Sequence, residues 1–385
     1  MQSFDVMVVG AGIVGLSAAL AMSQRGYSVA LMDAGRWAVD IDKLDARVYA
    51  INHASQSLFQ SLGVWENIDE TRMSPYQKMH VWDAASGAHI DFDARMSGCS
   101  RLGTILEESV VKQALMKKIA EENITVFSEC RVQCVEETKE GLSISDGVHS
   151  WTGKVLMVAD GANSATRALL GVSITQWPYH QNAIITRVQT KLPHQNTASQ
   201  VFQTEGPLAF LPLTNAHQCS IVWSVSAAKA QTLMDSSDET FSAQITEAFE
   251  RRLGTCEVMD QRHVFPLHMR HANAYSGPHW LLMGDAAHTI HPLAGLGLNL
   301  GLADLKAWLA ASGSSKTAVW SNSVFKAYQR QRKAKVWQMI ALMGGLKTLF
   351  ASPLTPVAAL RGLGLWTCDH MLPLKRFLME QAMDV

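Results

Sequence analysis

The N-terminal segment, residues 1–33, constrains the fold of this 385-residue chain more than any other stretch. Residues 4–9 form an apolar run typical of a strand, residues 16–25 have a helical pattern, and residues 27–32 form a second apolar run. The turn between the first strand and the helix has the motif GxGxxG, with glycines at Gly10, Gly12 and Gly15. A strand, a glycine-rich turn, a helix and a second strand in this order predict the βαβ unit of a Rossmann-like domain.

Each glycine of this turn has its own physical role in holding a dinucleotide. Gly10 permits the tight turn after the strand, Gly12 lets a pyrophosphate approach the backbone, and Gly15 lets the helix pack closely on the sheet. The helix N-terminus adds free N–H groups and the positive end of its dipole. Asp33 follows Gly15 by 18 residues, near the spacing at which an acidic side chain binds the ribose of an adenosine. A glycine-rich turn without a ligand is the alternative reading.

Two later strand ends also carry a glycine beside an aspartate. Asp160 and Gly161 follow an apolar strand at residues 155–159, and Gly284 and Asp285 follow a short apolar strand that begins at Trp280. Open α/β sheets bind ligands outside the carboxyl ends of their strands, so both pairs are candidate binding turns. An ordinary Asp-Gly turn is the alternative for the first pair. The second pair is followed, before a helix, by Gly295, Gly297, Leu298 and Asn299.

The rest of the chain predicts an α/β fold with an insertion and a helical end. Strand-type runs between residues 183 and 225 predict an antiparallel sheet inserted into the α/β domain. We therefore divide the chain into a discontinuous dinucleotide-binding domain, an inserted sheet domain and a C-terminal helical region. The predicted ranges are residues 1–180 with 265–320 for the first (including small inserted strands near 79–105), 181–264 for the second and 321–385 for the third.

Bulk composition excludes several classes of function. Lys plus Arg (33) and Asp plus Glu (34) nearly balance, which argues against a nucleic-acid partner. The six cysteines lack zinc-ligand spacing, and no carboxylate set completes a site with His288 and His291, so we predict no metal. Without an evident secretory or transmembrane segment, the predicted location is cytoplasmic. A hydrophobic fraction of 48% suggests a large buried ligand or a membrane-facing patch.

The three turns, in this order and spacing, resemble those of the class A flavoprotein aromatic monooxygenases, the group that includes p-hydroxybenzoate hydroxylase. A narrower resemblance, to the ubiquinone-biosynthesis hydroxylases, is carried by residues 46–51, Leu106-Glu107, the helix at 111–115, the run 328–332 and the tail from Leu374. The family resemblance spans almost the whole chain. It implies bound FAD, with NAD(P)H as a transient co-substrate that reduces the flavin and leaves.

The resemblance also implies roles for individual residues. It places FAD against the three turns, and Arg47 and Lys112 near the flavin; Lys112 stands where the family usually has Arg or Gln, so a solvated lysine is an equal alternative. His288, His291 and Pro292 are the candidate catalytic residues. The two histidines are candidates for lining the active-site roof or for a general base, with a structural role for one of them as the alternative. Phe210 and Pro212 are candidate substrate contacts, with the core of the sheet as the alternative. Arg330 and Arg332 are interpreted as solvated helix charges. The implied FAD-binding residues are Gly10, Gly12, Gly15, Asp33, Arg47, Lys112, Asp160, Gly161, Gly284, Asp285, Gly295, Gly297, Leu298 and Asn299.

The predicted function is hydroxylation of a polyprenylated phenol or quinol ring in ubiquinone biosynthesis, by O2 through a flavin C4a-hydroperoxide. The alternatives are hydroxylation of another aromatic substrate, a flavin reductase or halogenase of the same fold, and a non-catalytic flavin-bearing scaffold of the biosynthetic complex. The halogenase element Trp-x-Trp-x-Ile-Pro is missing at residues 221–225. The leucine-rich, basic tail predicts contact with other ubiquinone-biosynthesis proteins or peripheral attachment at the inner face of the plasma membrane, with packing on the protein's own core as the alternative.

Overall fold

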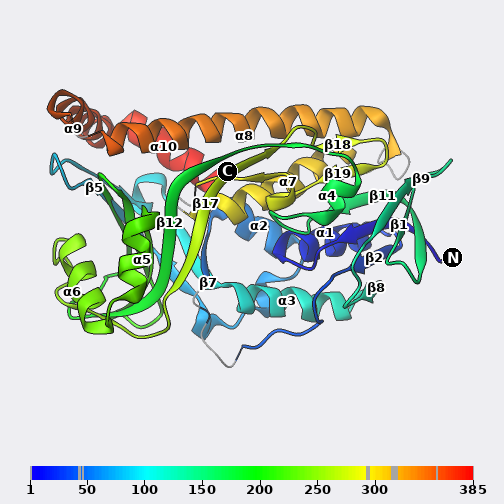
Figure 1. The fold of residues 1–385 in the computed structure, drawn as a ribbon, viewed down its shortest axis with the longest axis horizontal. Coiled ribbons are helices and arrows are strands. Elements are labelled where there is room, and N and C mark those ends of the chain that lie inside the picture. The colour runs from blue at the N-terminus through cyan, green and yellow to red at the C-terminus, as the bar shows by residue number, and fades with distance from the viewer. Residues whose placement is uncertain are drawn as a thin grey trace.

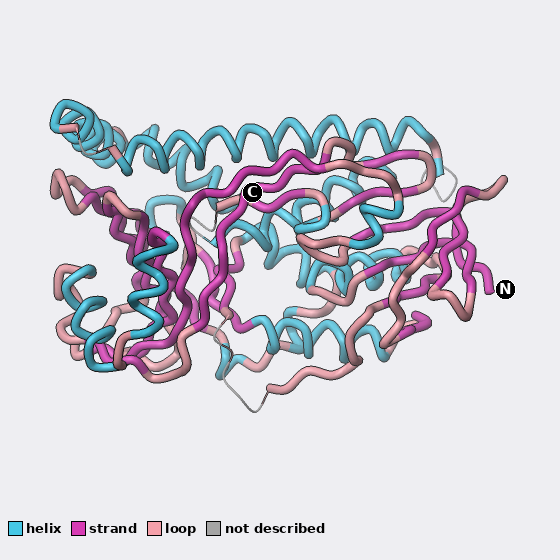
Figure 2. The backbone as a smooth tube through the Cα atoms, in the orientation of Figure 1, coloured by secondary structure: helices cyan, strands magenta, loops and turns pink. Residues whose placement is uncertain are grey.

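The computed structural model describes residues 2–41, 45, 47–291, 295–313, 320–352 and 354–384. It contains two large sheets, a small third sheet and helices that pack against them (Figures 1 and 2). The predicted fold class, an α/β domain with an inserted antiparallel sheet and a helical C-terminal region, is confirmed.

The first sheet has a parallel centre, in which β1 pairs with both β11 and β2, Val8 lying opposite Met157 and Leu31. The carboxyl halves of these strands are fully buried within the hydrophobic core, which explains their continuous apolar runs. In spatial order, the strands are β18 (Ser276–Gly277), β19 (Trp280–Leu282), β11 (Ser150–Val158), β1 (Gln2–Val9), β2 (Val29–Met32) and β8 (Ile124–Phe127), with β10 (Leu142–Ser145) and β9 (Cys134–Glu137) added beside β11.

The second sheet is mostly antiparallel and larger than predicted. Its strands are, in order, β20 (His288–Thr289), β17 (His263–Ala272), β12 (Ile174–Thr190), β15 (Gln218–Ser226), β14 (Gly206–Pro212), β13 (Thr197–Gln203), β5 (Lys78–Asp83) and β6 (His89–Asp93), with β16 (Cys256–Val258) beside β12. The strands β5 and β6 thus join this sheet, through parallel pairing of β5 with β13, whereas the sequence-based division grouped them with the dinucleotide-binding domain. The strands β12 and β17 also cross the predicted domain borders.

The small third sheet and the helices complete the fold. The sheet contains β3 (Val48–Ile51), β7 (Gly103–Glu107) and β4 (Ser74–Tyr76). The helices are α1 (Ile13–Gln24), α2 (His53–Ser61), α3 (Glu108–Ala120), α4 (Ala165–Leu169), α5 (Ala227–Asp235), α6 (Asp238–Ala248), α7 (Leu296–Ser312), α8 (Asn322–Ala351), α9 (Thr355–His370) and α10 (Leu372–Asp384). The long α8 runs past both large sheets (Figure 1).

The hydrophobic core has separate parts on the two large sheets. One cluster contains buried residues of the first sheet and of helices α1, α3 and α7. A second cluster lies between the second sheet and helices α5 and α6, and it includes Leu208, Phe210 and Trp223. Because side chains alternate along a strand, the neighbouring residues of β14 and β15 face the opposite side of this sheet. That opposite side is the one near the third sheet.

Candidate active site

The carboxyl ends of four neighbouring parallel strands meet at one edge of the first sheet. The strands β1, β2, β11 and β19 end at Val9, Met32, Val158 and Leu282. The residues that follow them are therefore brought to the same edge. Each of the three predicted binding turns begins there, as does the segment that starts with Asp33.

Contacts join the three turns directly. A Cβ atom on Gly10 would lie 2.4 Å from the Ala159 carbonyl oxygen, and one on Gly15 would lie 1.9 Å from the Gly10 oxygen. A Cβ atom on Gly284 would lie 3.3 Å from the Val14 side chain. The Asp160-Gly161 turn and the Gly284-Asp285 turn therefore both pack against the glycine-rich turn and the start of α1.

The residues at this edge fit an FAD molecule. Gly12 precedes α1, and a Cβ atom added to it would meet no described atom within 4 Å, so the backbone there is open to a pyrophosphate. The Oδ2 atom of Asp160 accepts from the Thr166 N–H, but its buried Oδ1 atom has no partner among the described residues. A buried carboxylate oxygen normally accepts a hydrogen bond, and a ligand hydroxyl would supply one.

Asp33 holds the glycine-rich turn in place. Its Oδ2 atom accepts from the Ala11 N–H at 2.6 Å, and its Oδ1 atom accepts from the Gly35 N–H at 2.7 Å. A carboxylate has about four acceptor positions, so two remain for ribose hydroxyls. The carboxylate therefore shapes the glycine-rich turn, and its role toward an adenosine ribose stays a prediction.

The third turn is held by a hydrogen bond from Gly284 to Asp304, and the segment after it leads to a helix N-terminus. The Asp304 carboxylate accepts from the Gly284 N–H at 2.9 Å. Burial raises the pKa of the neighbouring Asp285 carboxyl, and His288 and Arg47 oppose that rise. Gly295 precedes α7 in the left-handed region, with a φ of 63°, and no described side chain caps the helix. Its N–H groups remain available to a ligand.

The other predicted residues of α7 divide into open and buried positions. A Cβ atom on Gly297 would meet no described atom within 4 Å, whereas Leu298 is buried. The Asn299 amide donates to the Ala50 carbonyl at 2.7 Å and accepts from the Asn52 N–H at 3.2 Å. Asn299 therefore ties α7 to β3, and it places the helix N-terminus beside the strand that follows Arg47.

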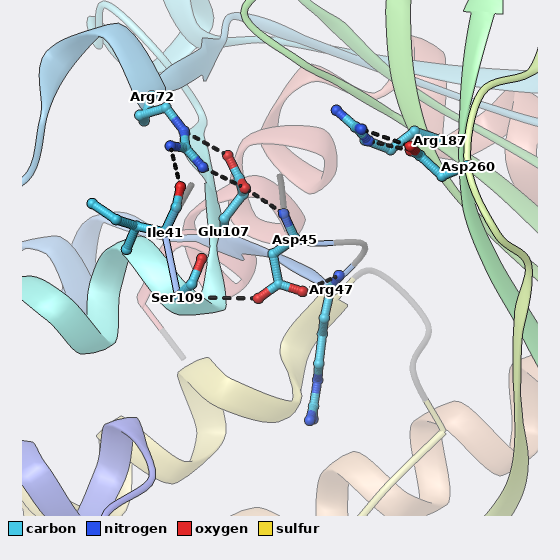
Figure 3. Close-up of polar contacts among 8 residues, drawn as sticks. All are labelled: Ile41, Asp45, Arg47, Arg72, Glu107, Ser109, Arg187 and Asp260. Atoms are coloured by element: carbon cyan, nitrogen blue, oxygen red, sulfur yellow. Dashed lines mark hydrogen bonds and ion pairs between the residues drawn. The ribbon is translucent and has the colours of Figure 1, made fainter. Parts of the chain in front are cut away.

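Figure 3 shows how the segment before β3 is held. The Arg72 guanidinium donates to both carboxylate oxygens of Glu107, at 2.9 and 2.7 Å, and to the Ile41 carbonyl at 3.2 Å. Glu107 also accepts from the Asp45 N–H at 2.6 Å. The Asp45 carboxylate in turn accepts from the Ser109 N–H, at the start of α3. These contacts join Ile41 and Asp45 to β7 and to the start of α3.

The same group of contacts lies beside Arg47. The Arg47 guanidinium lies 3.3 Å from the Glu108 carboxylate and 5.3 Å from the centre of the Tyr49 ring. Tyr49 also donates to Glu108, at 3.1 Å. Lys112 lies one turn beyond Glu108 on α3, on the same face of the helix. Arg47 thus interacts electrostatically with Asp285. Lys112 is half-buried.

His288 belongs to a buried ionic network. Its Nε2 atom lies 2.7 Å from the Asp304 Oδ2 atom, and the Arg332 Nε atom donates to Asp304 Oδ1 at 2.6 Å. Burial alone would raise the pKa of Asp304, but His288 and Arg332 outweigh it and hold the pKa below its ordinary value. Arg332 is buried, so its interpretation as a solvated helix charge is wrong. This network fixes the third turn against α7 and α8.

His291 has a different environment. Its Nε2 atom lies 3.3 Å from the Gln181 Oε1 atom, and its ring packs edge-on against Tyr179. The Nδ1 atom of His291 is buried without a partner in the described part of the chain. Pro292, the third candidate catalytic residue, lies outside the described residues. The catalytic roles of the two histidines stay predictions.

The two candidate substrate contacts on β14 lie on the outer face of the second sheet, which packs against α5 and α6, and not on its inner face. Phe210 stacks on Phe249 of α6 at 3.7 Å between ring centres, and Pro212 lies on the same face of β14, so both point away from the first sheet. The half-buried residues that face the other way are Ile185, Ala209, Leu211 and Val222. Strand periodicity gives the alternation of these residues, but not which of the two faces meets the cofactor.

No metal site accompanies this arrangement within the described ranges, where no group of three His, Cys, Asp or Glu side chains could hold an ion. Nor does any described helix have the length and apolarity needed to cross a membrane.

Comparison with known proteins agrees with the geometry. The family model described as FAD binding domain matches residues 3–342. The 3-demethoxyubiquinol 3-hydroxylase of Escherichia coli is 33% identical over 392 residues, which cover 100% of this chain and 99% of that protein. The mitochondrial ubiquinone biosynthesis monooxygenase COQ6 of Drosophila melanogaster is 29% identical, and the match covers 99% of this chain and 90% of that protein.

Solved structures share the fold. The p-nitrophenol 4-monooxygenase PnpA of Pseudomonas putida has a TM-score of 0.81 at 17% identity, covering 100% of this chain and 99% of that one. PqsL of Pseudomonas aeruginosa, described as a probable FAD-dependent monooxygenase, has a TM-score of 0.77 at 18% identity, covering 95% of this chain and 100% of that one. FAD is accordingly the cofactor. The chain belongs to the FAD-dependent aromatic-ring monooxygenases, and among them to the ubiquinone-biosynthesis hydroxylases.

Proposed function

We propose that this protein uses FAD, NAD(P)H and O2 to hydroxylate the ring of a polyprenylated phenol or quinol in ubiquinone biosynthesis. The observation that carries the proposal is the meeting of three distant turns, at Gly10, Asp160 and Gly284, around the start of α1. The names of the full-length relatives supply the substrate class.

Different residues at this edge of the first sheet are assigned to different parts of FAD. The pyrophosphate is assigned to the N-terminus of α1 at Gly12, and the adenosine ribose to Asp33. The ribityl hydroxyls are assigned to Asp160 and Asp285, and the pyrimidine edge of the flavin to the α7 N-terminus at Gly295. Bound FAD supplies the oxygen-activating chemistry, which no side chain can provide.

The inner face of the second sheet supplies the surroundings of the substrate ring. Ile185, Ala209, Leu211 and Val222 present half-buried apolar side chains there. Such a lining holds an aromatic ring and excludes water from the reacting atoms. We assign substrate contact to these four residues in place of Phe210 and Pro212.

Turnover by the purified, FAD-loaded protein tests this function. NAD(P)H oxidation should depend on a phenol that carries a short prenyl chain, and mass spectrometry should find one added oxygen atom in the ring. A phenol without the chain serves as the comparison for substrate class. Flavin that NAD(P)H never reduces, with any prenylated phenol present, would favour the scaffold function instead.

We also infer that the outer face of α9 contacts an anionic lipid surface, where a polyprenyl substrate resides. Leu360, Leu363 and Trp366 are 67%, 59% and 55% exposed and form one stripe. Arg361 fixes the helix by pairing with the Asp83 carboxylate at 2.9 Å. Residues 333–379 contain six Lys or Arg residues and one Asp, in a chain with a net charge of −1; Arg361 and Lys375 are buried in ion pairs, which leaves four other basic residues in this segment. An apolar stripe in a basic segment suits an anionic bilayer.

Replacing Leu360, Leu363 and Trp366 by serine should weaken binding to vesicles of anionic phospholipid by at least about tenfold, because each loses buried apolar area at the interface. Sedimentation with vesicles measures this binding. The control is Val148→Ser, at an 83% exposed valine on a remote turn. Equal binding of the triple variant and the parent protein would contradict the inference, as would equal binding to neutral vesicles.

A further inference from the structure

The loop residue His291 lies among polar groups from two other elements. Gln181 and Tyr179 come from β12, and Lys347 comes from α8. The Lys347 ammonium donates to the Tyr179 carbonyl at 2.6 Å and lies 4.9 Å from the centre of the Tyr179 ring. His291, Gln181 and Lys347 line one hollow of about 10 Å³, which has room for about one water molecule.

The hydrogen bonds of Gln181 determine which nitrogen of His291 carries the proton. The Gln181 Nε2 atom lies 2.5 Å from the Glu205 carbonyl oxygen, which can only accept, so the amide nitrogen faces Glu205. The Oε1 atom then faces His291 at 3.3 Å and can only accept. The proton therefore resides on Nε2 of His291, and Nδ1 presents a lone pair.

The sequence around Gln181 favours this arrangement. A Cβ atom on Gly206 would lie 2.7 Å from the Gln181 Nε2 atom, so the amide reaches Glu205 only because a glycine stands there. The register of β12 against β17 shifts between Pro178 and Asn182, and His180 at this bulge has a φ of 55°. Tyr179 and Gln181, which lie within this irregular part of β12, both contact His291.

The Nδ1 lone pair is buried and has no partner among the described residues. His291 is 1% exposed, and no described atom donates to its Nδ1. Burial lowers the pKa of His291 to about 4, and Lys347 adds to the lowering, so the imidazole is neutral near pH 7. Lys347 and Tyr179 are the titratable groups that face it. In contrast, Nε2 of His288 is bound to Asp304 within the structural network.

We propose that His291 is the general base that accepts the hydroxyl proton of the substrate ring, and that Gln181 is the positioning residue that presents its Nδ1 lone pair. This proposal rests on the proposed function. The ring O–H bond breaks, its proton moves to Nδ1, and its electron pair stays on the oxygen. The hydroxyl becomes strongly acidic as the ring gives electrons to the incoming oxygen atom, so a weak neutral base is sufficient.

A binding comparison tests the contact without turnover. The probes are a methoxyphenol with a geranyl chain and its methyl ether, titrated into the oxidised holoenzyme. The parent protein should bind the phenol about tenfold more tightly, as expected for one hydrogen bond of about 1.4 kcal/mol. In His291→Phe this ratio should fall to about one. His149→Phe, at an exposed histidine, is the control and should keep the ratio.

Kinetics and a conservative pair of variants separate positioning from packing. His291→Phe should lower kcat about 100-fold or more, as loss of a general base does, while NAD(P)H still reduces the flavin at the parent rate. Gln181→Leu and Gln181→Met, which both remove the acceptor toward Nε2 but differ in shape, should lower kcat and the binding ratio to the same extent.

The outcomes distinguish this proposal from the proposed function. Equal affinity of the parent protein for phenol and ether would overturn the role of His291 and leave the function intact. A water in the small hollow would satisfy Nδ1 without favouring the hydroxyl, and it would give this same result. A parent protein that binds neither probe would overturn the substrate class, and the proposal with it.

Discussion

Replacing Asp304 with asparagine is expected to lower the free energy of unfolding by about 3–5 kcal/mol, the usual cost of leaving a buried charge uncompensated. Asp304 is 0% exposed and accepts from Arg332, His288 and the Gly284 N–H. The variant keeps the shape of the side chain but leaves the buried Arg332 guanidinium without its counter-charge. Urea unfolding of the apoprotein measures the change.

Two further variants show whether loss of the buried counter-charge causes the destabilisation by Asp304→Asn. Glu247→Gln removes half of an exposed ion pair with Arg251 and should cost at most about 1 kcal/mol. The double change of Asp304 and Arg332 to leucine removes both buried charges and should recover much of the lost stability. If Asp304→Asn and Glu247→Gln have equal effects, the network does not hold the third turn in the way described.

The sequence predicted the parts of the fold that local patterns determine. The strand, glycine turn, helix and strand of residues 1–33 are confirmed as β1, α1 and β2. The turns at Asp160 and Gly284 follow buried strands, and parallel pairing of β11 and β19 brings them to the edge where Gly10 lies. This placement could be predicted because the carboxyl ends of parallel strands share an edge.

The features that the sequence did not predict depend on tertiary contacts. The alternation of Leu208, Ala209 and Phe210 was visible, yet only helices α5 and α6 determine that Phe210 belongs to the outer core. Arg332 resembles the exposed Arg330 on the same helix until Asp304 of α7 is placed beside it. Strands β5 and β6 join the second sheet through a partner more than 100 residues away. Each case depends on contacts between segments far apart in the chain.

The substitution Gly12→Ala is expected to weaken FAD binding by about 100-fold or more, equivalent to about 3 kcal/mol, without destabilising the apoprotein. The φ of Gly12 is −73° and its ψ is 171°, a conformation that alanine adopts readily. A Cβ atom there would meet no described protein atom within 4 Å. The methyl group would instead occupy the space that a pyrophosphate needs. Fluorescence titration with FAD and urea unfolding of the apoprotein measure the two effects separately.

Two other glycines make the loss at Gly12 interpretable. Gly15→Ala would place its Cβ atom 1.9 Å from the Gly10 oxygen, so it should reduce both stability and FAD affinity. Gly344→Ala, at an open position within α8, should add about 0.5–1 kcal/mol of stability through helix propensity and leave FAD affinity unchanged. If Gly12→Ala bound FAD as tightly as the parent protein, the pyrophosphate would not lie at the α1 N-terminus. A loss of apoprotein stability equal to that of Gly15→Ala would mean that Gly12 serves the fold and not the ligand.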